Sequence, residues 1–287
     1  MTLASTLART LSASFALSFL TVMSPVVADT TTEAGAQPET EAPIDDAAAR
    51  GRQFAEEADE ADRGFKWMSA DGRMILIDAR GNQNIREFES RILEDLEDGD
   101  RGTIVFLRPP DIAKTALLTI GNKGVDDHQW IYLPALKRVK RISASGKTGS
   151  FVGSEFTYED LGSPQLDDYS YLWLAEEPCP GDASLVCTVL QRVPHDKDSG
   201  YSRIVSWYDN STFRILKAEY YDRKGALLKV LIASDFELFK DRFWRAHRLV
   251  MTNQVNGKST EMVWRGFDFD TALDENDFTT RALERLQ

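Results

Sequence analysis

The sequence of 287 residues has few of the residues that most often carry chemistry. It contains two cysteines and three histidines, and the histidines are scattered at His128, His195 and His247. Neither an H-E-x-x-H metal-binding motif nor a G-x-S-x-G nucleophile motif occurs. Gly146-Lys147-Thr148 resembles the end of a phosphate-binding loop, but Arg141 stands where that loop needs a glycine. These absences predict a protein that is not an enzyme and that binds no metal and no cofactor.

A long apolar run is lacking as well. The stretch from Leu11 to Met23 is interrupted by serine and threonine and is shorter than the ~20 residues that cross a bilayer. It follows Arg9 and precedes the small residues Val26-Val27-Ala28, which is typical of a cleaved signal peptide over residues 1–28. A retained membrane anchor is the alternative. We expect an exported protein with no stable membrane anchor after cleavage.

Positive charge is scarce, because 34 Lys and Arg stand against 46 Asp and Glu, for a formal net charge of -12. Removal of residues 1–28 takes away the charge of Arg9 and no acidic residue, so -12 becomes -13. The phosphates of nucleic acid repel such a surface, which excludes a nucleic-acid partner. The exception is one basic cluster, formed by Lys137, Arg138, Lys140 and Arg141. This cluster predicts a contact with anionic headgroups or an acidic partner, or alternatively an edge strand that uses charge to prevent aggregation.

The two cysteines are close in the sequence. Cys179 and Cys187 flank Pro180-Gly181, a spacing that suits two strand ends joined across a turn. In an exported protein they would meet oxidising conditions, so we expect a disulfide, with a free pair as the alternative. Closing so short a loop stabilises the fold by roughly 2–3 kcal/mol at most.

The chain changes character along its length. Residues 29–46 are rich in Thr, Glu, Ala and Pro, which predicts a disordered acidic leader. Residues 47–62 predict a helix that follows a cap at Asp45 or Asp46. Next, Asp71-Gly72 predicts a hairpin between the β-rich runs at residues 65–69 and 74–78. Further strands are expected at residues 103–107, 115–120, 129–133, 138–142, 169–174, 187–193, 204–208, 213–221, 227–232, 243–252 and 260–269.

About a dozen strands with few helices between them predict an α+β protein with one large antiparallel sheet or barrel over residues 47–287. Several strands, such as Met74–Ile77 and Trp130–Leu133, are apolar on both faces and therefore need cover on both faces. That cover could come from a sheet that curls on itself, from a few helices, or from an apolar ligand. An ordinary sandwich core is the alternative.

A Gly/Ser loop near the middle of the chain is flanked by aromatic residues. Phe151, Phe156 and Tyr158 predict either a movable gate or core residues that lie behind a loop. The adjacent Glu159 and Asp160 predict a capping or turn role, because neighbouring positions cannot face each other for acid–base catalysis.

Four segments resemble a known family. They are RGTIVFLRPPDIAKTALLTI (Arg101–Ile120), DDHQWIYLPALKRVKRIS (Asp126–Ser143), GSFVGSEFTYEDL (Gly149–Leu161) and LDENDFTTRALER (Leu273–Arg285). The chain resembles the bacterial outer-membrane lipoprotein-sorting proteins, which are periplasmic and related in fold to LolA and LolB. One departure is Ala113-Lys114-Thr115, where the family often has glycine after the lysine. The resemblance implies an incomplete β-barrel whose mouth is covered by a few helices and whose apolar interior receives lipid chains.

The resemblance also implies a function. We expect a periplasmic carrier or chaperone that binds lipid or lipoprotein acyl chains and moves them toward the outer membrane, with a transporter of the resistance-nodulation-division (RND) class as partner. The basic cluster would form a charged rim and Phe151–Tyr158 a gate. The residues expected to contact lipid are Leu117, Trp130, Tyr132, Phe151 and Phe156. The alternatives are a docking accessory protein that carries no lipid, an envelope hydrolase, and a structural protein with a solid core.

Overall fold

A computed structural model describes residues 44–286 of the chain. The predicted signal peptide and the predicted leader up to residue 43 lie outside the described residues. Helix α1 (Ile44–Asp62) begins three residues before the predicted boundary, so residues 44–46 belong to the helix. Within the described part of the chain, no helix has the length and apolar character needed to cross a membrane.

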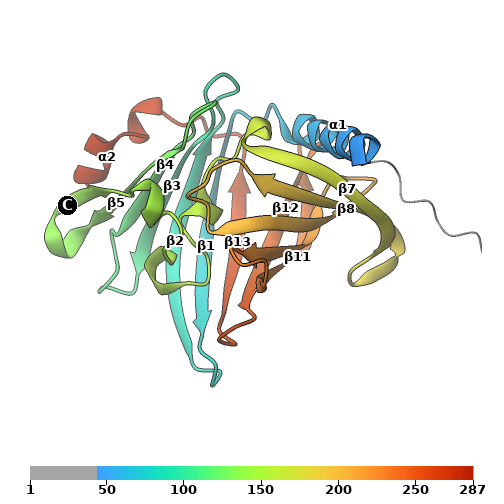
Figure 1. The fold of residues 1–287 in the computed structure, drawn as a ribbon. Helices are drawn as coiled ribbons and strands as arrows, with labels where there is room; N and C mark the ends of the chain where they lie inside the picture. The colour runs from blue at the N-terminus through green and yellow to red at the C-terminus, as the bar shows by residue number, and fades with distance from the viewer. Residues whose placement is uncertain (1–43, 287) are drawn as a thin grey trace, which may run out of the picture. The chain divides into compact units, whose positions relative to one another are not determined.

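The rest of the chain forms one sheet of thirteen strands (Figure 1). The order across the sheet is β6-β5-β4-β3-β2-β1-β13-β12-β11-β10-β9-β8-β7, so strands that are neighbours in the sequence pair with each other, except β6 and β7, and β1 joins β13. The strands are β1 (Trp67–Ile77), β2 (Gln83–Leu93), β3 (Arg101–Arg108), β4 (Ala116–Ile120), β5 (His128–Leu133), β6 (Arg138–Arg141), β7 (Tyr169–Cys179), β8 (Asp182–Pro194), β9 (Tyr201–Asp209), β10 (Ile215–Asp222), β11 (Leu227–Phe239), β12 (Phe243–Asn253) and β13 (Ser259–Asp268).

All twelve pairings are antiparallel, and β6 and β7 are the two edges of the sheet. The sheet curves without closing, which confirms the predicted incomplete barrel. The connection from β6 to β7, residues 142–168, leaves one edge and returns to the other. Short 3-10 helices punctuate the chain: η1 (Pro134–Leu136), η2 (Ala144–Gly146), η3 (Phe151–Gly153), η4 (Glu159–Leu161), η5 (Leu166–Asp168) and η6 (Glu275–Asp277).

The predicted hairpin at Asp71-Gly72 is wrong, because β1 runs straight through these residues. A Cβ atom on Gly72 would lie 2.1 Å from Cζ of Phe88, so glycine is there to admit the aromatic ring of the neighbouring strand. The chain turns later, at Asp78, whose Oδ1 accepts hydrogen bonds from the backbone N–H groups of Arg80 and Asn82. Strand β2, which follows that turn, was missing from the predicted strands.

The two α-helices pack on opposite faces of the sheet (Figure 1). Helix α1 packs on β7, and the contact is close because a Cβ on Gly51 would lie 2.7 Å from the backbone nitrogen of Trp173. Helix α2 (Thr280–Glu284) packs against β4, β5 and β6 through Leu283, in a cluster with Leu118. Leu117 belongs to the inner cluster, and successive strand residues point to opposite faces. The prediction that helices cover the mouth therefore holds for α1, and α2 covers the outer face.

The expected disulfide joins Cys179 at the end of β7 to Cys187 in β8. The two cysteines lie across the β7–β8 turn, and their Cα atoms are 4.9 Å apart. Cys187 is fully buried, so the bond fastens the tip of this hairpin from within.

Candidate functional site

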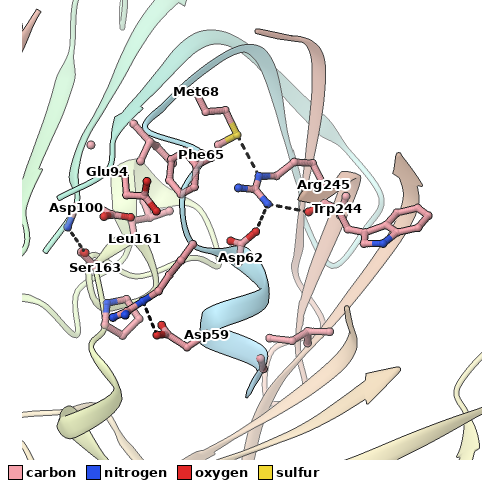
Figure 2. Close-up of a pocket in the computed structure, with 18 of the residues that line it drawn as sticks. Asp59, Asp62, Phe65, Met68, Glu94, Asp100, Leu161, Ser163, Trp244 and Arg245 are labelled. Carbon is pink, nitrogen blue, oxygen red and sulfur yellow. Dashed lines mark hydrogen bonds and ion pairs between the residues drawn. The ribbon is translucent and has the colours of Figure 1, made fainter. Parts of the chain in front are cut away.

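A cavity of about 800 Å³ lies between α1 and the inner face of the sheet (Figure 2). Strands from both halves of the sheet and the last part of the β6–β7 connection contribute to its wall. Its apolar lining includes Ile104, Leu117, Leu231, Ala233, Leu249 and Trp264. The volume is within the range of roughly 300–1,000 Å³ that is typical of ligand sites. The interior of this barrel is therefore hollow at one end.

Helix α1 covers the cavity and is fastened at its middle and at its end. Near the middle of the helix, the ring of Phe54 contacts Trp173 on β7 edge to face, with ring centroids 5.7 Å apart. At its end, Asp62 accepts a hydrogen bond of 2.6 Å from Arg245 on β12 (Figure 2). Just beyond the helix, Glu94 at the end of β2 accepts a hydrogen bond of 2.6 Å from the backbone N–H of Gly64. The helix thus bridges the two halves of the sheet.

Carboxylates gather where α1 ends. Asp100 lies near Asp62, Glu94 and Asp95, and these negative charges add to an effect of burial. Burial, as the larger cause, raises the pKa of Asp100 from 3.8 to about 6, although the backbone N–H of Asp95 partly offsets it. The side chain of Ser163 accepts a hydrogen bond of 3.1 Å from the backbone N–H of Asp100 (Figure 2). This end of the cavity is therefore acidic and polar, in contrast to its apolar wall.

The other end of the barrel interior is filled. The β6–β7 connection places Phe151 against Phe106, with stacked rings 5.6 Å apart, in a cluster that includes Met74, Met251 and Met262. Each of these five residues is at most 1% exposed. We refer to this region as the packed end and to the region under α1 as the cavity end.

A buried ion pair fixes the connection where the packed end meets the cavity end. Lys229 Nζ lies 2.5 Å from Asp160 Oδ2, and the two side chains are only 3% and 4% exposed. Asp160 also accepts hydrogen bonds from the backbone N–H of Thr157, at 2.6 Å, and from the hydroxyl of Tyr201, at 2.8 Å. Lys229 donates a second hydrogen bond to the carbonyl of Glu155. Asp160 therefore has a structural role of the kind expected from its place in a turn.

The predicted lipid-contact residues do not lie together. Leu117 lines the cavity. Trp130 and Tyr132 pair with Leu118 and Ala116 across β4 and β5, so they lie on the opposite face, in the cluster that α2 covers. The cavity gives no support for lipid contact by these two aromatic residues.

Phe151 and Phe156 lie in the packed end, where they are 0% and 3% exposed. Neither lines the cavity. Arg86 donates a hydrogen bond to the carbonyl of Val152, and the hydroxyl of Thr260 accepts one from the backbone N–H of Glu155. Of the two predicted roles for these aromatic residues, the geometry matches core residues behind a loop, and a gate role stays a prediction.

The basic cluster Lys137, Arg138, Lys140 and Arg141 lies on and beside the edge strand β6, and all four residues are exposed. Within the described residues, none of them has a carboxylate within 4.0 Å, and none lines the cavity. Arg141 instead lies over the ring of Trp130. The cluster is therefore placed at a sheet edge and away from the cavity, and its role as a contact for a partner stays a prediction.

Sequence reasoning missed the polar residues of the cavity, among them Asp100, Arg192 and Arg245. One signal was available: Arg192 is the one charged residue in the mostly apolar segment LVCTVLQRVP. A charged residue at an inward position of a strand needs a reason, because inward positions are usually apolar.

Two solved structures are similar to this chain over most of its length. A domain from Vibrio parahaemolyticus, described as an outer membrane lipoprotein-sorting protein domain, is 43% identical, with a TM-score of 0.80, and the match covers 83% of this chain and 100% of that one. A DUF1329 family protein from Desulfovibrio piger is 30% identical, with a TM-score of 0.77, and the match covers 83% of this chain and 99% of that one.

More distant comparisons agree on the fold. A LolA superfamily protein from Nitrosomonas europaea is 18% identical, with a TM-score of 0.64 over 81% of this chain and 98% of that one. A family model described as "-like: Uncharacterized protein" matches residues 98–285. No curated protein sequence shows significant similarity. The open barrel described above is thus a LolA-like fold.

Proposed function

We propose that this chain, which belongs to the bacterial outer membrane lipoprotein-sorting protein family, is a periplasmic carrier that shelters lipid or lipoprotein acyl chains. The observation that supports this proposal is the apolar cavity of about 800 Å³ under α1. A sixteen-carbon chain in water exposes methylenes worth ~0.8 kcal/mol each, or about 12 kcal/mol in total. The apolar part of this cavity wall offsets that cost better than a shallow surface groove would.

The lipid would lie along the inner face of the sheet. We propose that Leu117, Leu231, Leu249 and Trp264 contact its hydrocarbon, because these side chains line the cavity from four different strands. Shelter of this kind involves no bond making or breaking, so the proposed activity is carriage and not catalysis. Helix α1 would have to move for cargo to enter, and its Asp62–Arg245 ion pair is a polar contact that such a movement would break.

The place of action and the partner are also proposals. Export by the predicted signal peptide would put the acidic protein in the periplasm, from which it would deliver cargo toward the outer membrane. We propose that the exposed basic cluster on β6 contacts an acidic surface of an envelope transporter of the RND class or the anionic headgroups of a membrane. Its support is the absence of ion-pair partners for the four residues within the described part of the chain.

The cavity can be tested by filling it. In Ala233→Trp, the indole would occupy the cavity, whereas Ile232→Trp places the same side chain on the opposite, exposed face of β11. Each protein is purified from its own cell envelope, extracted with organic solvent, and analysed by mass spectrometry. We expect lipid at close to one molecule per chain in the wild type and in Ile232→Trp, and little or none in Ala233→Trp. Equal lipid in all three proteins would contradict the proposal.

A second candidate function is docking on a transporter without carriage of lipid. The exposed basic cluster favours it, because the cluster lies at a sheet edge that pairs with no further strand in the described residues. Extracts that are empty in every preparation would favour this function. Reversing the charge of Lys137, Arg138, Lys140 and Arg141 would then abolish binding to the envelope fraction.

A further inference from the structure

Arginines line the cavity at several positions, and all but one of them have a carboxylate partner within the described residues. Arg63 pairs with Asp59, Arg91 with Glu89, Arg214 with Asp209, Arg242 with Glu60, and Arg245 with Asp62. Arg192 on β8 has none within 4.0 Å among residues 44–286. Its Nε atom is shielded from solvent and has no hydrogen-bond partner there.

The surroundings of Arg192 are aromatic. In the sheet it pairs directly with Tyr171 on β7, and its guanidinium lies 5.2 Å from the centre of the Tyr169 ring. Tyr169, Tyr171 and Tyr208 line the same cavity. Within residues 44–286, the hydroxyls of these three tyrosines form no hydrogen bond with protein atoms, unlike that of Tyr201, which donates to Asp160. This part of the wall therefore presents one guanidinium and several hydroxyl donors. Within the described residues, no carboxylate pairs with the guanidinium and no protein acceptor receives a hydrogen bond from these hydroxyls.

Arg192 is partly buried, and the shielding of its Nε without a hydrogen-bond partner is costly for an ionised group. Taking an unpaired ionised group out of water costs far more than burying apolar surface, and a guanidinium cannot relieve the cost by losing its proton. Replacing a buried charge by an apolar side chain is often neutral or stabilising. Within the described residues, the charge of Arg192 is compensated only by its contact with the Tyr169 ring, and an acceptor from outside the chain would account for it.

We propose that Arg192 and the tyrosines around it form a subsite for the acid group of an anionic amphiphile whose hydrocarbon occupies the rest of the cavity. This inference rests on the proposed function, and it narrows the cargo to molecules that carry a carboxylate or phosphate on an apolar body. A planar guanidinium can donate a pair of hydrogen bonds to a carboxylate or to a phosphate. The tyrosine hydroxyls can donate further hydrogen bonds to the oxygens of the same acid group.

The test uses two probes with the same hydrocarbon chain, the charged cis-parinaric acid and its neutral methyl ester, with binding measured by fluorescence at a pH where the acid is ionised. The wild type should bind the acid ~10- to 100-fold more tightly than the ester, as expected for hydrogen bonds to a charged group. In Arg192→Met, affinity for the acid should fall to that for the ester, and affinity for the ester should stay unchanged. Arg192→Lys should keep part of the preference.

Arg203→Met is the matched control, because Arg203 is on the neighbouring strand β9, stacks on Tyr221 and does not line the cavity. It should keep the preference of the wild type. Inorganic phosphate added in excess distinguishes a headgroup-only site from an amphiphile site: displacement of the acid by phosphate alone would overturn the need for an apolar body.

The two proposals fail in different ways. If the wild type binds acid and ester equally well, the Arg192 subsite is wrong and the carrier function stands. If it binds neither probe, both are wrong. Tyr169→Phe and Tyr171→Phe, which keep the rings and remove one hydroxyl each, cover the case in which Arg192→Met does not fold. They should weaken binding of the acid and not of the ester, and no change in either variant would overturn the subsite.

Discussion

The packed end and the cavity end of the barrel are built from the same strands, yet one is solid and the other is hollow. Ala218 on β10 lies in the packed cluster, whereas Ala233 on the adjacent strand β11 lines the cavity. The difference comes from the β6–β7 connection, which fills one end with Phe151 and Phe156 and only borders the other with residues 160–166. A curved antiparallel sheet thus leaves space by default, and an inserted segment decides how much of it remains.

The largest expected effect is in the packed end, at the Lys229–Asp160 ion pair. Lys229→Met removes one partner and leaves Asp160 buried without its cation, which should lower the free energy of unfolding by ~3–5 kcal/mol. Urea denaturation followed by circular dichroism measures this loss. The double variant Lys229→Met/Asp160→Leu removes both charges and should recover much of the stability. A single variant that unfolds like the wild type would show that the connection is not held by this pair.

A smaller effect should separate the two ends directly. Ala218→Trp forces an indole into the packed cluster, where Ala218 is 2% exposed, and overpacking of this kind costs ~1–3 kcal/mol or more. Ala233→Trp has the cavity to enter and should cost less. Paired chemical denaturation of the two variants gives the comparison. Equal losses would mean that the cavity end collapses around its wall and is not hollow in solution.

A comparable or smaller effect is expected from pH, and one of its two main sources, Asp100, lines the cavity. The pKa of Asp100 is raised by burial from 3.8 to about 6, and burial likewise raises that of Asp127 to about 6. Between these values the folded protein holds protons that the unfolded chain has lost, so stability should fall as pH rises from about 4 to about 6. At 1.36 kcal/mol per pKa unit, each carboxyl contributes on the order of 1–3 kcal/mol.

Asp100→Asn tests the assignment by measuring the free energy of unfolding at several pH values. The variant should lose part of the decline between pH 4 and pH 6, with the remainder due to Asp127 and to Asp59 and Asp168, whose pKa values burial also raises. The ion-paired Asp209 does not disturb this window, because its pKa is lowered to about 2, and the stability that it adds is lost only as pH falls below about 4. A slope that is unchanged in the variant would contradict the burial of Asp100.

Much of the fold could be predicted from the sequence, because strand periodicity is a local property. Eleven of the predicted strands match β3 to β13, and the helix at α1 was expected from its composition. The errors have local causes too. Asp71-Gly72 has the sequence of a turn, but the glycine serves the approach of Phe88 from β2, a contact that is invisible until the strands are paired.

The site was harder to predict, because one residue of register decides which face a side chain occupies. Leu117 and Trp130 are equally apolar in the sequence, yet one lines the cavity and the other lies under α2. Arg192 and the tyrosines around it are brought together by strand pairing across β7, β8 and β9. The inference drawn from these residues depends on the ion-pair and hydrogen-bond partners that they lack within the described residues, and only a three-dimensional structure shows this.

The most direct test of a lipid-filled cavity end uses two of the six tryptophans as reporters. Trp264 lines the cavity and Trp130 lies on the opposite face of the sheet, so single-tryptophan variants that retain one or the other, with phenylalanine at the remaining positions, report on each face. Both are titrated with a fatty acid that is brominated along its chain, since bromine quenches tryptophan fluorescence on contact. We predict saturable quenching of Trp264 and none of Trp130. Quenching of Trp130 as strong as that of Trp264, or a bound fatty acid that leaves Trp264 unquenched, would contradict the carrier account.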